Sequence, residues 1–126
     1  MKAVLLGVAI AFSATAATTA MAADAKLGQK TFRAQCGICH QGGPGDGDGG
    51  QGPNLNGVVG RKAGTAADFS YTPALKNSGN VWTQANLDRF LTDPSKMVPG
   101  TAMPVSIPDT KTRQDLIAYL ATLHGH

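Results

Sequence analysis

Two long stretches of this chain are unsuited to helix or strand, and they limit its fold more than any other feature of the sequence. Residues 41–53 consist largely of glycine, and residues 94–109 contain four prolines. Because glycine and proline interrupt regular structure, we expect the first stretch to be a loop and the second to be an extended, stiff loop. Loops of this length are uncommon in a compact domain unless they have a function. The sequence therefore predicts that both loops wrap around something.

Short helices are favoured between and beside these loops. We expect one over residues 26–36, one over 72–79 that starts with a Thr-Pro pair, and one over 83–93 that ends before a proline. The larger apolar positions of the first helix are Leu27, Phe32 and Ala34.

The clearest helical pattern is at the C-terminus. Thr112 and Asp115 resemble a capping box, in which side chains satisfy the free N–H groups of a helix start. Apolar residues then recur at helical spacing, at Leu116, Ile117, Tyr119, Leu120 and Leu123. Since strand-like alternation is nearly absent, we expect an all-α fold of short helices and long Gly/Pro loops.

Composition limits what such a fold can bury. The chain has 126 residues, of which 42% are hydrophobic and only 6% aromatic. This indicates one domain with a thin core, to which something else has to add apolar volume. The net charge of +3, without a basic cluster, argues against a nucleic-acid-binding protein.

The N-terminus has the pattern of a secretory signal peptide. Lys2 precedes the apolar run 3–12, and Ala20-Met21-Ala22 forms a small-x-small cleavage site. A membrane anchor is the alternative, but the run is too short to span a bilayer comfortably. We therefore expect residues 1–22 to be removed near Ala22/Ala23, leaving a domain over 23–126 in the periplasm.

Both cysteines of the chain belong to one motif, Cys36-Gly37-Ile38-Cys39-His40. The spacing Cys-x-x-Cys-His is the attachment site of a c-type haem. Each thiol can add to one vinyl group, and the histidine next in sequence becomes the proximal ligand of the iron. One haem, held covalently through Cys36 and Cys39, would also supply the missing apolar volume.

Three other sites use similar residues. A structural zinc site needs four ligands, and the other histidines, His124 and His126, lie in the C-terminal tail. A redox dithiol usually belongs to a βαβ unit, which this sequence lacks. A disulfide across so short a loop would stabilise little. All three are less favoured than haem.

The second axial position of the iron has four candidates in the sequence. Met97 is near a helix end, where packing alone explains it, and His124 and His126 fit a solvated tail. Met103 lies between prolines in a rigid loop, far enough along the chain to reach the opposite haem face. A thioether there would favour the ferrous state.

The ordered set of motifs closely resembles the class I cytochromes c, of the mitochondrial and bacterial cytochrome c2 type. The resemblance covers the whole chain after the signal peptide and implies the class I cytochrome c fold. The motifs are Cys36-Gly37-Ile38-Cys39-His40, Gly52-Pro53-Asn54-Leu55, Gly60-Arg61-Lys62, Phe69-Ser70-Tyr71-Thr72, Trp82, Pro99-Gly100-Thr101-Ala102-Met103 and Asp115-Leu116-Ile117-Ala118-Tyr119-Leu120.

The resemblance assigns roles to single residues. It implies that His40 and Met103 are the axial ligands of the iron, with Met103 preferred over Met97. It implies that the Pro53 carbonyl accepts the proton of the other His40 ring nitrogen, which fixes the tautomer. It also implies a set of residues that contact the haem propionates or the ligand loop: Arg61, Tyr71, Trp82 and Thr101.

The resemblance also implies how two helices cross. Gly28 and Phe32 match positions of a first helix that lie against Leu116 and Tyr119 of the last helix. A glycine at such a crossing lets two helix backbones approach closely.

By the same resemblance, the chain is a soluble electron carrier and not an enzyme. It would shuttle electrons between membrane complexes, from a cytochrome bc1-type donor to a terminal oxidase or a reaction centre, without forming a stable oligomer. A second interpretation is a haem enzyme or gas sensor with a labile sixth ligand. A third is the electron acceptor of a periplasmic dehydrogenase.

The loop at 46–49 alternates aspartate and glycine, which faintly resembles a calcium-binding loop. It lacks the further oxygen ligands and the closing glutamate of an EF-hand, and the chain has no glutamate at all. We therefore expect this loop to be flexible and solvated.

Overall fold

The computed structural model describes residues 21–125, so most of the predicted signal peptide and His126 lie outside the described residues. Its helices are α1 (Ala25–Thr31), the π-helical turn η1 (Phe32–Cys36), α2 (Pro73–Lys76), α3 (Gln84–Thr92), α4 (Pro94–Met97) and α5 (Thr110–Leu120). The described part of the chain has no strand beyond one isolated bridge between Lys62 and Val81. This confirms the all-α prediction. None of its helices is long and apolar enough to cross a membrane.

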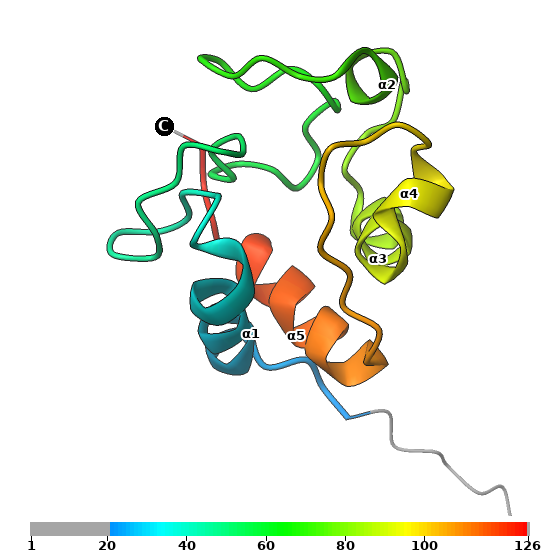
Figure 1. Ribbon diagram of the computed structural model, residues 1–126. Coiled ribbons are helices and arrows are strands. Elements are labelled where there is room, and N and C mark those ends of the chain that lie inside the picture. The colour runs from blue at the N-terminus through cyan, green and yellow to red at the C-terminus, as the bar shows by residue number, and fades with distance from the viewer. Residues whose placement is uncertain (1–20, 126) are drawn as a thin grey trace, which may run out of the picture.

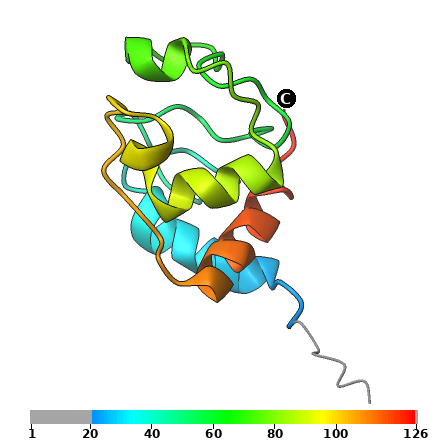
Figure 2. The same cartoon turned by 90° about the vertical axis from the view of Figure 1, so that its right-hand side faces the viewer.

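Helix α5 is the longest helix of the described residues, and it contacts α1 and α3. In both views α1 lies beside α5 at one end of the molecule, whereas α2 lies at the other end (Figures 1 and 2). Helix α3 also contacts both α4 and α5. Long irregular segments connect η1 with α2 and α4 with α5 (Figure 1).

The first helix forms where the sequence predicts it, but not every apolar residue of this segment lies on its buried face. The side chain of Asp24 accepts hydrogen bonds from the backbone N–H groups of Lys26 and Leu27 and so caps α1. Of the larger apolar residues of this helix, Leu27 is 46% exposed and Ala34 is also exposed. The buried face is set instead by residues four apart, namely Gly28, Phe32 and Cys36, and Leu27 is turned away from it by about 100°.

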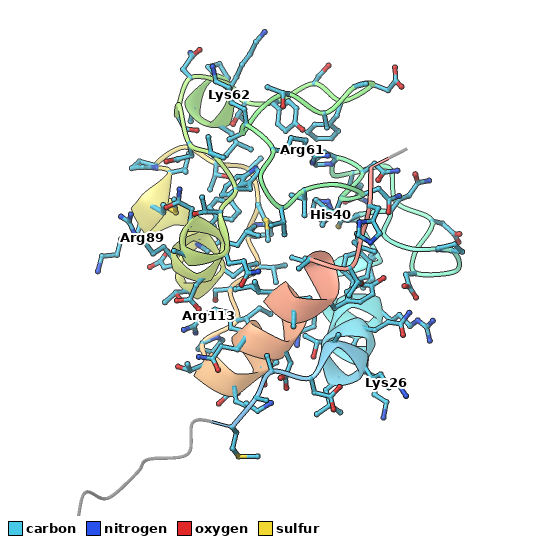
Figure 3. The ribbon with its side chains drawn as sticks, turned by 180° about the vertical axis from the view of Figure 1, so that it is seen from behind. Lys26, His40, Arg61, Lys62, Arg89 and Arg113 are labelled. Atoms are coloured by element: carbon cyan, nitrogen blue, oxygen red, sulfur yellow. The ribbon has the colours of Figure 1, made fainter. Side chains whose placement is uncertain are left out.

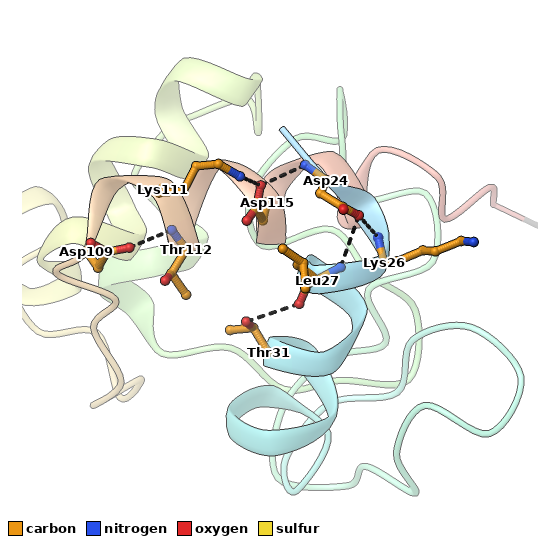
Figure 4. Close-up of polar contacts among 8 residues, drawn as sticks. All are labelled: Asp24, Lys26, Leu27, Thr31, Asp109, Lys111, Thr112 and Asp115. Carbon is orange, nitrogen blue, oxygen red and sulfur yellow. Dashed lines mark hydrogen bonds and ion pairs between the residues drawn. The ribbon is translucent and has the colours of Figure 1, made fainter. Parts of the chain in front are cut away.

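The last helix starts earlier than the capping-box pattern predicts. Its N-cap is Asp109, whose side chain accepts a hydrogen bond of 2.7 Å from the backbone N–H of Thr112. The predicted pairing of Thr112 with Asp115 is therefore wrong. Asp115 has another task, because it accepts hydrogen bonds from the Asp24 backbone N–H and from Lys111 Nζ (Figure 4). It thus connects the start of α1 to α5.

The segment 94–109 is not wholly extended, which corrects the second loop prediction. Helix α4 forms one turn over Pro94–Met97, capped by Asp93, whose side chain accepts a hydrogen bond from the backbone N–H of Lys96. A proline is compatible with this turn because the first helical position needs no N–H partner. The predicted starts of α2 and α3 are confirmed, since Thr72 and Thr83 are their N-caps, but α2 ends at Lys76, before Gly79.

Helices α1 and α5 cross at Gly28. A Cβ atom on Gly28 would lie 1.9 Å from the carbonyl oxygen of Asp115 and 2.9 Å from the backbone nitrogen of Leu116. Four residues further along, the ring of Phe32 lies with its centroid 5.3 Å from that of Tyr119. The implied crossing is therefore present, and only a glycine fits at its centre.

Gly28→Ala tests this crossing. An exposed helical Gly→Ala change stabilises by about 1 kcal/mol, but here we expect the free energy of unfolding to fall by about 2–3 kcal/mol because the helix backbones have to separate. Denaturant unfolding measures the difference. Lys30→Ala, at an exposed position of the same helix, should change little. A stabilised Gly28→Ala variant would contradict the close crossing.

Candidate functional site

A cavity of about 370 Å³ lies between the helices and the two loops. Its wall is mostly apolar and comes from segments far apart in the sequence. The lining residues are Gln35, Cys36, Cys39, His40, Gln51, Gly52, Pro53, Leu55, Val58, Arg61, Phe69, Ser70, Tyr71, Thr72, Leu75, Trp82, Leu87, Phe90, Leu91, Thr101, Ala102, Met103, Pro104, Val105, Leu116 and Leu120. All nine residues that the sequence singled out for cofactor binding are among them.

The Cys-x-x-Cys-His motif forms a tight turn at the end of η1. The backbone N–H groups of Cys39 and His40 both donate to the carbonyl of Cys36, at 3.0 and 2.8 Å. Cys36 is buried and Cys39 is half-buried, and both thiols are free. Burial, together with the neighbouring Cys39, raises the pKa of the Cys36 thiol to about 11. The turn therefore presents two thiols and one imidazole to the same cavity.

His40 is held by a backbone hydrogen bond. Its Nδ1 atom lies 2.7 Å from the carbonyl oxygen of Pro53, so Nδ1 carries the proton and donates it. The pKa of His40 is lowered, because desolvation and the charge of Arg61 outweigh the opposing effect of the bond to Pro53. A neutral ring protonated at Nδ1 leaves the Nε2 lone pair available, which is the form in which histidine binds metals.

The structure separates the candidates for the second ligand. Met103 lines the cavity and is half-buried, and its backbone N–H donates to Thr101 Oγ1 at 3.4 Å. Met97 packs against the hydrophobic core and is not part of the cavity wall. His124 is exposed and is also absent from the wall.

The segment that carries Met103 is fastened by Arg113, which the sequence analysis missed. Arg113 is buried, with 6% of its surface exposed, and lies between α3 and α5 (Figure 3). Its guanidinium donates to the carbonyls of Ile107 and Pro108 and pairs with Asp88 at 2.7 Å. An arginine in a helix pattern is ordinarily solvated, so no local signal indicated this role.

Arg61, Tyr71 and Trp82 bring polar groups to the cavity wall. The Arg61 guanidinium is already fixed by the carbonyls of Asn54 and Asn56, at 3.0 and 3.2 Å. Tyr71 accepts a hydrogen bond from a backbone N–H through its hydroxyl, whose own proton can still be donated. Trp82 is buried against the ring of Phe90. Figure 3 shows His40 and Arg61 among the loops above α5.

The glycine-rich loop is anchored at Asp46, which corrects the expectation of a solvated loop at this residue, whereas Gly47 and Asp48 are exposed as expected. Asp46 is only 1% exposed. Its carboxylate accepts hydrogen bonds from Gln29 Nε2 at 2.9 Å, from Arg33 Nε at 2.5 Å and from the hydroxyl of Tyr119. These donors lie 13 to 73 residues away along the chain, so no local pattern indicates them.

The donor set fits a haem. Two thiols and an imidazole lie on one turn, a thioether lies on a distant loop, and the remaining wall is mainly apolar with hydrogen-bond donors at Arg61 and Tyr71. By contrast, among residues 21–125 no group of three or more His, Cys, Asp or Glu side chains is placed to hold a metal ion. The site is thus suited to a large apolar cofactor that brings its own metal.

Comparison with known proteins agrees with this geometry. The family model for cytochrome c matches residues 25–124. Cytochrome c2 of Rhodomicrobium vannielii is 44% identical over 99% of this chain and 97% of its own length. Two similar solved structures each match 79% of this chain and 98% of their own chain. Cytochrome cH from Methylobacterium extorquens is 48% identical with a TM-score of 0.71. Ferricytochrome c2 from Rhodopseudomonas palustris is 40% identical with a TM-score of 0.70.

The anchoring of Asp46 predicts a pH-dependent stability. Desolvation alone would raise its pKa, but the hydrogen bonds from Gln29, Tyr119 and Arg33 outweigh it and hold the pKa below the ordinary value of 3.8. Because the pKa of Asp46 is lower in the folded chain than in the unfolded chain, its ionised carboxylate stabilises the fold above pH 3.8. This contribution is lost as the pH falls through the folded pKa.

Asp46→Asn should therefore lower the free energy of unfolding at pH 7 by on the order of 2 kcal/mol. The difference from wild type should shrink as the pH falls from 3.8 through the lower folded pKa of Asp46, because below that pKa the wild-type side chain is also neutral. Denaturant unfolding across this pH range measures the convergence, and Asp48→Asn, at an exposed position, is the control. A difference that does not change with pH would contradict the charged anchor.

Proposed function

Because this chain belongs to the cytochrome c family, we propose that Cys36 and Cys39 attach the haem and that His40 and Met103 ligate its iron. Members of this family are electron carriers without enzymatic activity, and they bind haem c covalently. One observation carries the ligand assignment. Met103 shares a cavity wall with the Cys-x-x-Cys-His turn, whereas Met97 and His124 do not.

When bound, the haem supplies an iron centre that cycles between two oxidation states by one electron. The residues of this chain set its environment. His40, kept neutral and oriented by Pro53, offers a basic nitrogen. The soft thioether of Met103 favours the reduced state and raises the potential. The apolar wall excludes water, which limits rearrangement during transfer.

The polar residues at the cavity have a second task in this proposal. A haem carries two propionates, and a carboxylate at a buried site needs hydrogen-bond donors. Arg61, Tyr71 and Trp82 would donate to these groups, and Thr101 would bond near the inner propionate and hold the Met103 loop. The fixed guanidinium of Arg61 and the free hydroxyl proton of Tyr71 support this assignment.

Redox partners of this family are membrane complexes in general. We propose that this chain is a soluble periplasmic carrier between a cytochrome bc1-type donor and a terminal oxidase or reaction centre. A periplasmic dehydrogenase is the alternative donor. The signal-peptide pattern of residues 1–22 supports a periplasmic location.

Met103→Ala tests the ligand assignment. We expect the oxidised wild-type protein to show the weak far-red sulfur-to-iron charge-transfer band, and the variant to lose it and bind cyanide or carbon monoxide rapidly. Optical spectroscopy measures both. Met97→Ala is the matched control and should keep the band. A wild-type protein without the band, with rapid ligand binding, would instead indicate a labile sixth position.

The proposed location is tested by the mature N-terminus. Protein recovered from a periplasmic fraction should begin at Ala23 or within a residue or two of it, as measured by intact-mass spectrometry. A chain that keeps residues 1–22 and fractionates with membranes would contradict export with cleavage and support an N-terminal anchor.

A further inference from the structure

We propose that Asp46 is a positioning residue for His40, acting through the backbone of residues 47–53. The inference rests on the proposed function, because it takes His40 as the proximal ligand of the iron. It assigns a role to the glycine-rich loop that neither the sequence pattern nor the ligand set explains.

The first part of the argument is the anchor. Oδ1 of Asp46 is used by Arg33, and Oδ2 by Gln29 and Tyr119. These partners come from α1, η1 and α5, so one carboxylate fixes the start of the loop to both crossing helices. A further bond, from the Asp46 backbone N–H to the carbonyl of Gly43 at 2.9 Å, closes a turn at the same point.

The second part is the contact between the loop and the haem-attachment turn. Gly47 has a φ of +107°, and a Cβ atom there would lie 2.5 Å from the carbonyl oxygen of Gly37 and 2.6 Å from that of His40. At Gly52 a Cβ atom would lie 2.4 Å from Cε1 of the His40 ring. The loop backbone therefore rests directly on the Cys-x-x-Cys-His turn, at distances that a side chain would prevent.

The third part is the far end of the loop. The backbone N–H of Gly52 donates to the carbonyl of Cys39 at 2.9 Å, and the next residue, Pro53, accepts the bond from His40 Nδ1. The strip 47–53 is thus fixed at one end by Asp46 and at the other by His40. Because the strip is rich in glycine, it has little stiffness of its own. Loss of the Asp46 anchor should therefore loosen the bond that orients His40.

The experiment compares haem-loaded Asp46→Ala with wild type. NMR measures the solvent exchange of the His40 Nδ1 proton, and spectroelectrochemistry measures the reduction potential. We expect exchange to become roughly tenfold faster, because losing hydrogen bonds to a charged group changes an opening equilibrium by about that factor, and we expect the potential to shift. Asp48→Ala is the matched control, since Asp48 is an exposed residue of the same loop. It should leave both quantities unchanged.

Two milder variants keep the test decisive if Asp46→Ala does not mature. Tyr119→Phe removes one of the three side-chain donors, and Asp46→Asn keeps the volume but loses the charge. Both should accelerate exchange, by less than Asp46→Ala. Variants that lose stability but leave the exchange rate and the potential at wild-type values would overturn the inference and reduce Asp46 to a helix anchor.

The same spectra separate this inference from the ligand assignment. If the His40 ring protons of wild type show no paramagnetic shift from the oxidised iron, the proposed function fails. If they show that shift but exchange is unaffected in every Asp46 and Tyr119 variant, only the positioning role fails.

Discussion

The contact between α1 and α5 at Gly28 is the interaction on which the rest of the structure depends. The Cys-x-x-Cys-His turn follows α1 through η1 without a break, and α5 contributes Leu116 and Leu120 to the cavity wall. How closely α1 and α5 approach each other therefore fixes the distance between the Cys-x-x-Cys-His turn and that wall. The bond from the Asp24 backbone to Asp115 closes the open end of the crossing (Figure 4). A bulkier residue at position 28 would displace both sides of the site at once.

Two segments with little regular structure complete the site, and each is fastened by a buried ionic side chain. Asp46 holds the glycine-rich loop against α1, η1 and α5, and Arg113 holds the end of the segment that carries Met103 against α3 and α5. Buried charges with full sets of hydrogen bonds are demanding in geometry. They therefore suit a chain in which most of the site has no helix or strand to define it. Within residues 21–125, every buried side-chain polar atom has a partner.

Features that depend on neighbouring residues could be predicted from the sequence, whereas long-range contacts could not. Neighbouring residues are enough to predict the cap of α3 at Thr83, and the structure contains this cap. They also single out the Cys-x-x-Cys-His turn, which the structure places at the cavity. The capping-box pattern predicts the wrong start for α5. The backbone N–H of Thr112 donates to Asp109, three residues before it, and not to Asp115. Asp46 and Arg113 carried no local signal, since their partners are brought together only by the fold. The wall residues Leu116 and Leu120 were expected to be buried, but their helical spacing did not say that they face a cofactor.

The central claim is that the apolar cavity is completed by a covalently attached haem, which supplies the missing volume of a thin core. The most direct measurement is the denaturant unfolding of the chain prepared without haem, followed by the near-UV signal of Trp82, beside the haem-loaded protein. The account predicts one cooperative transition with haem and none, or one with a much smaller dependence on denaturant, without it. A haem-free chain that unfolds cooperatively with the same midpoint and slope would contradict the claim.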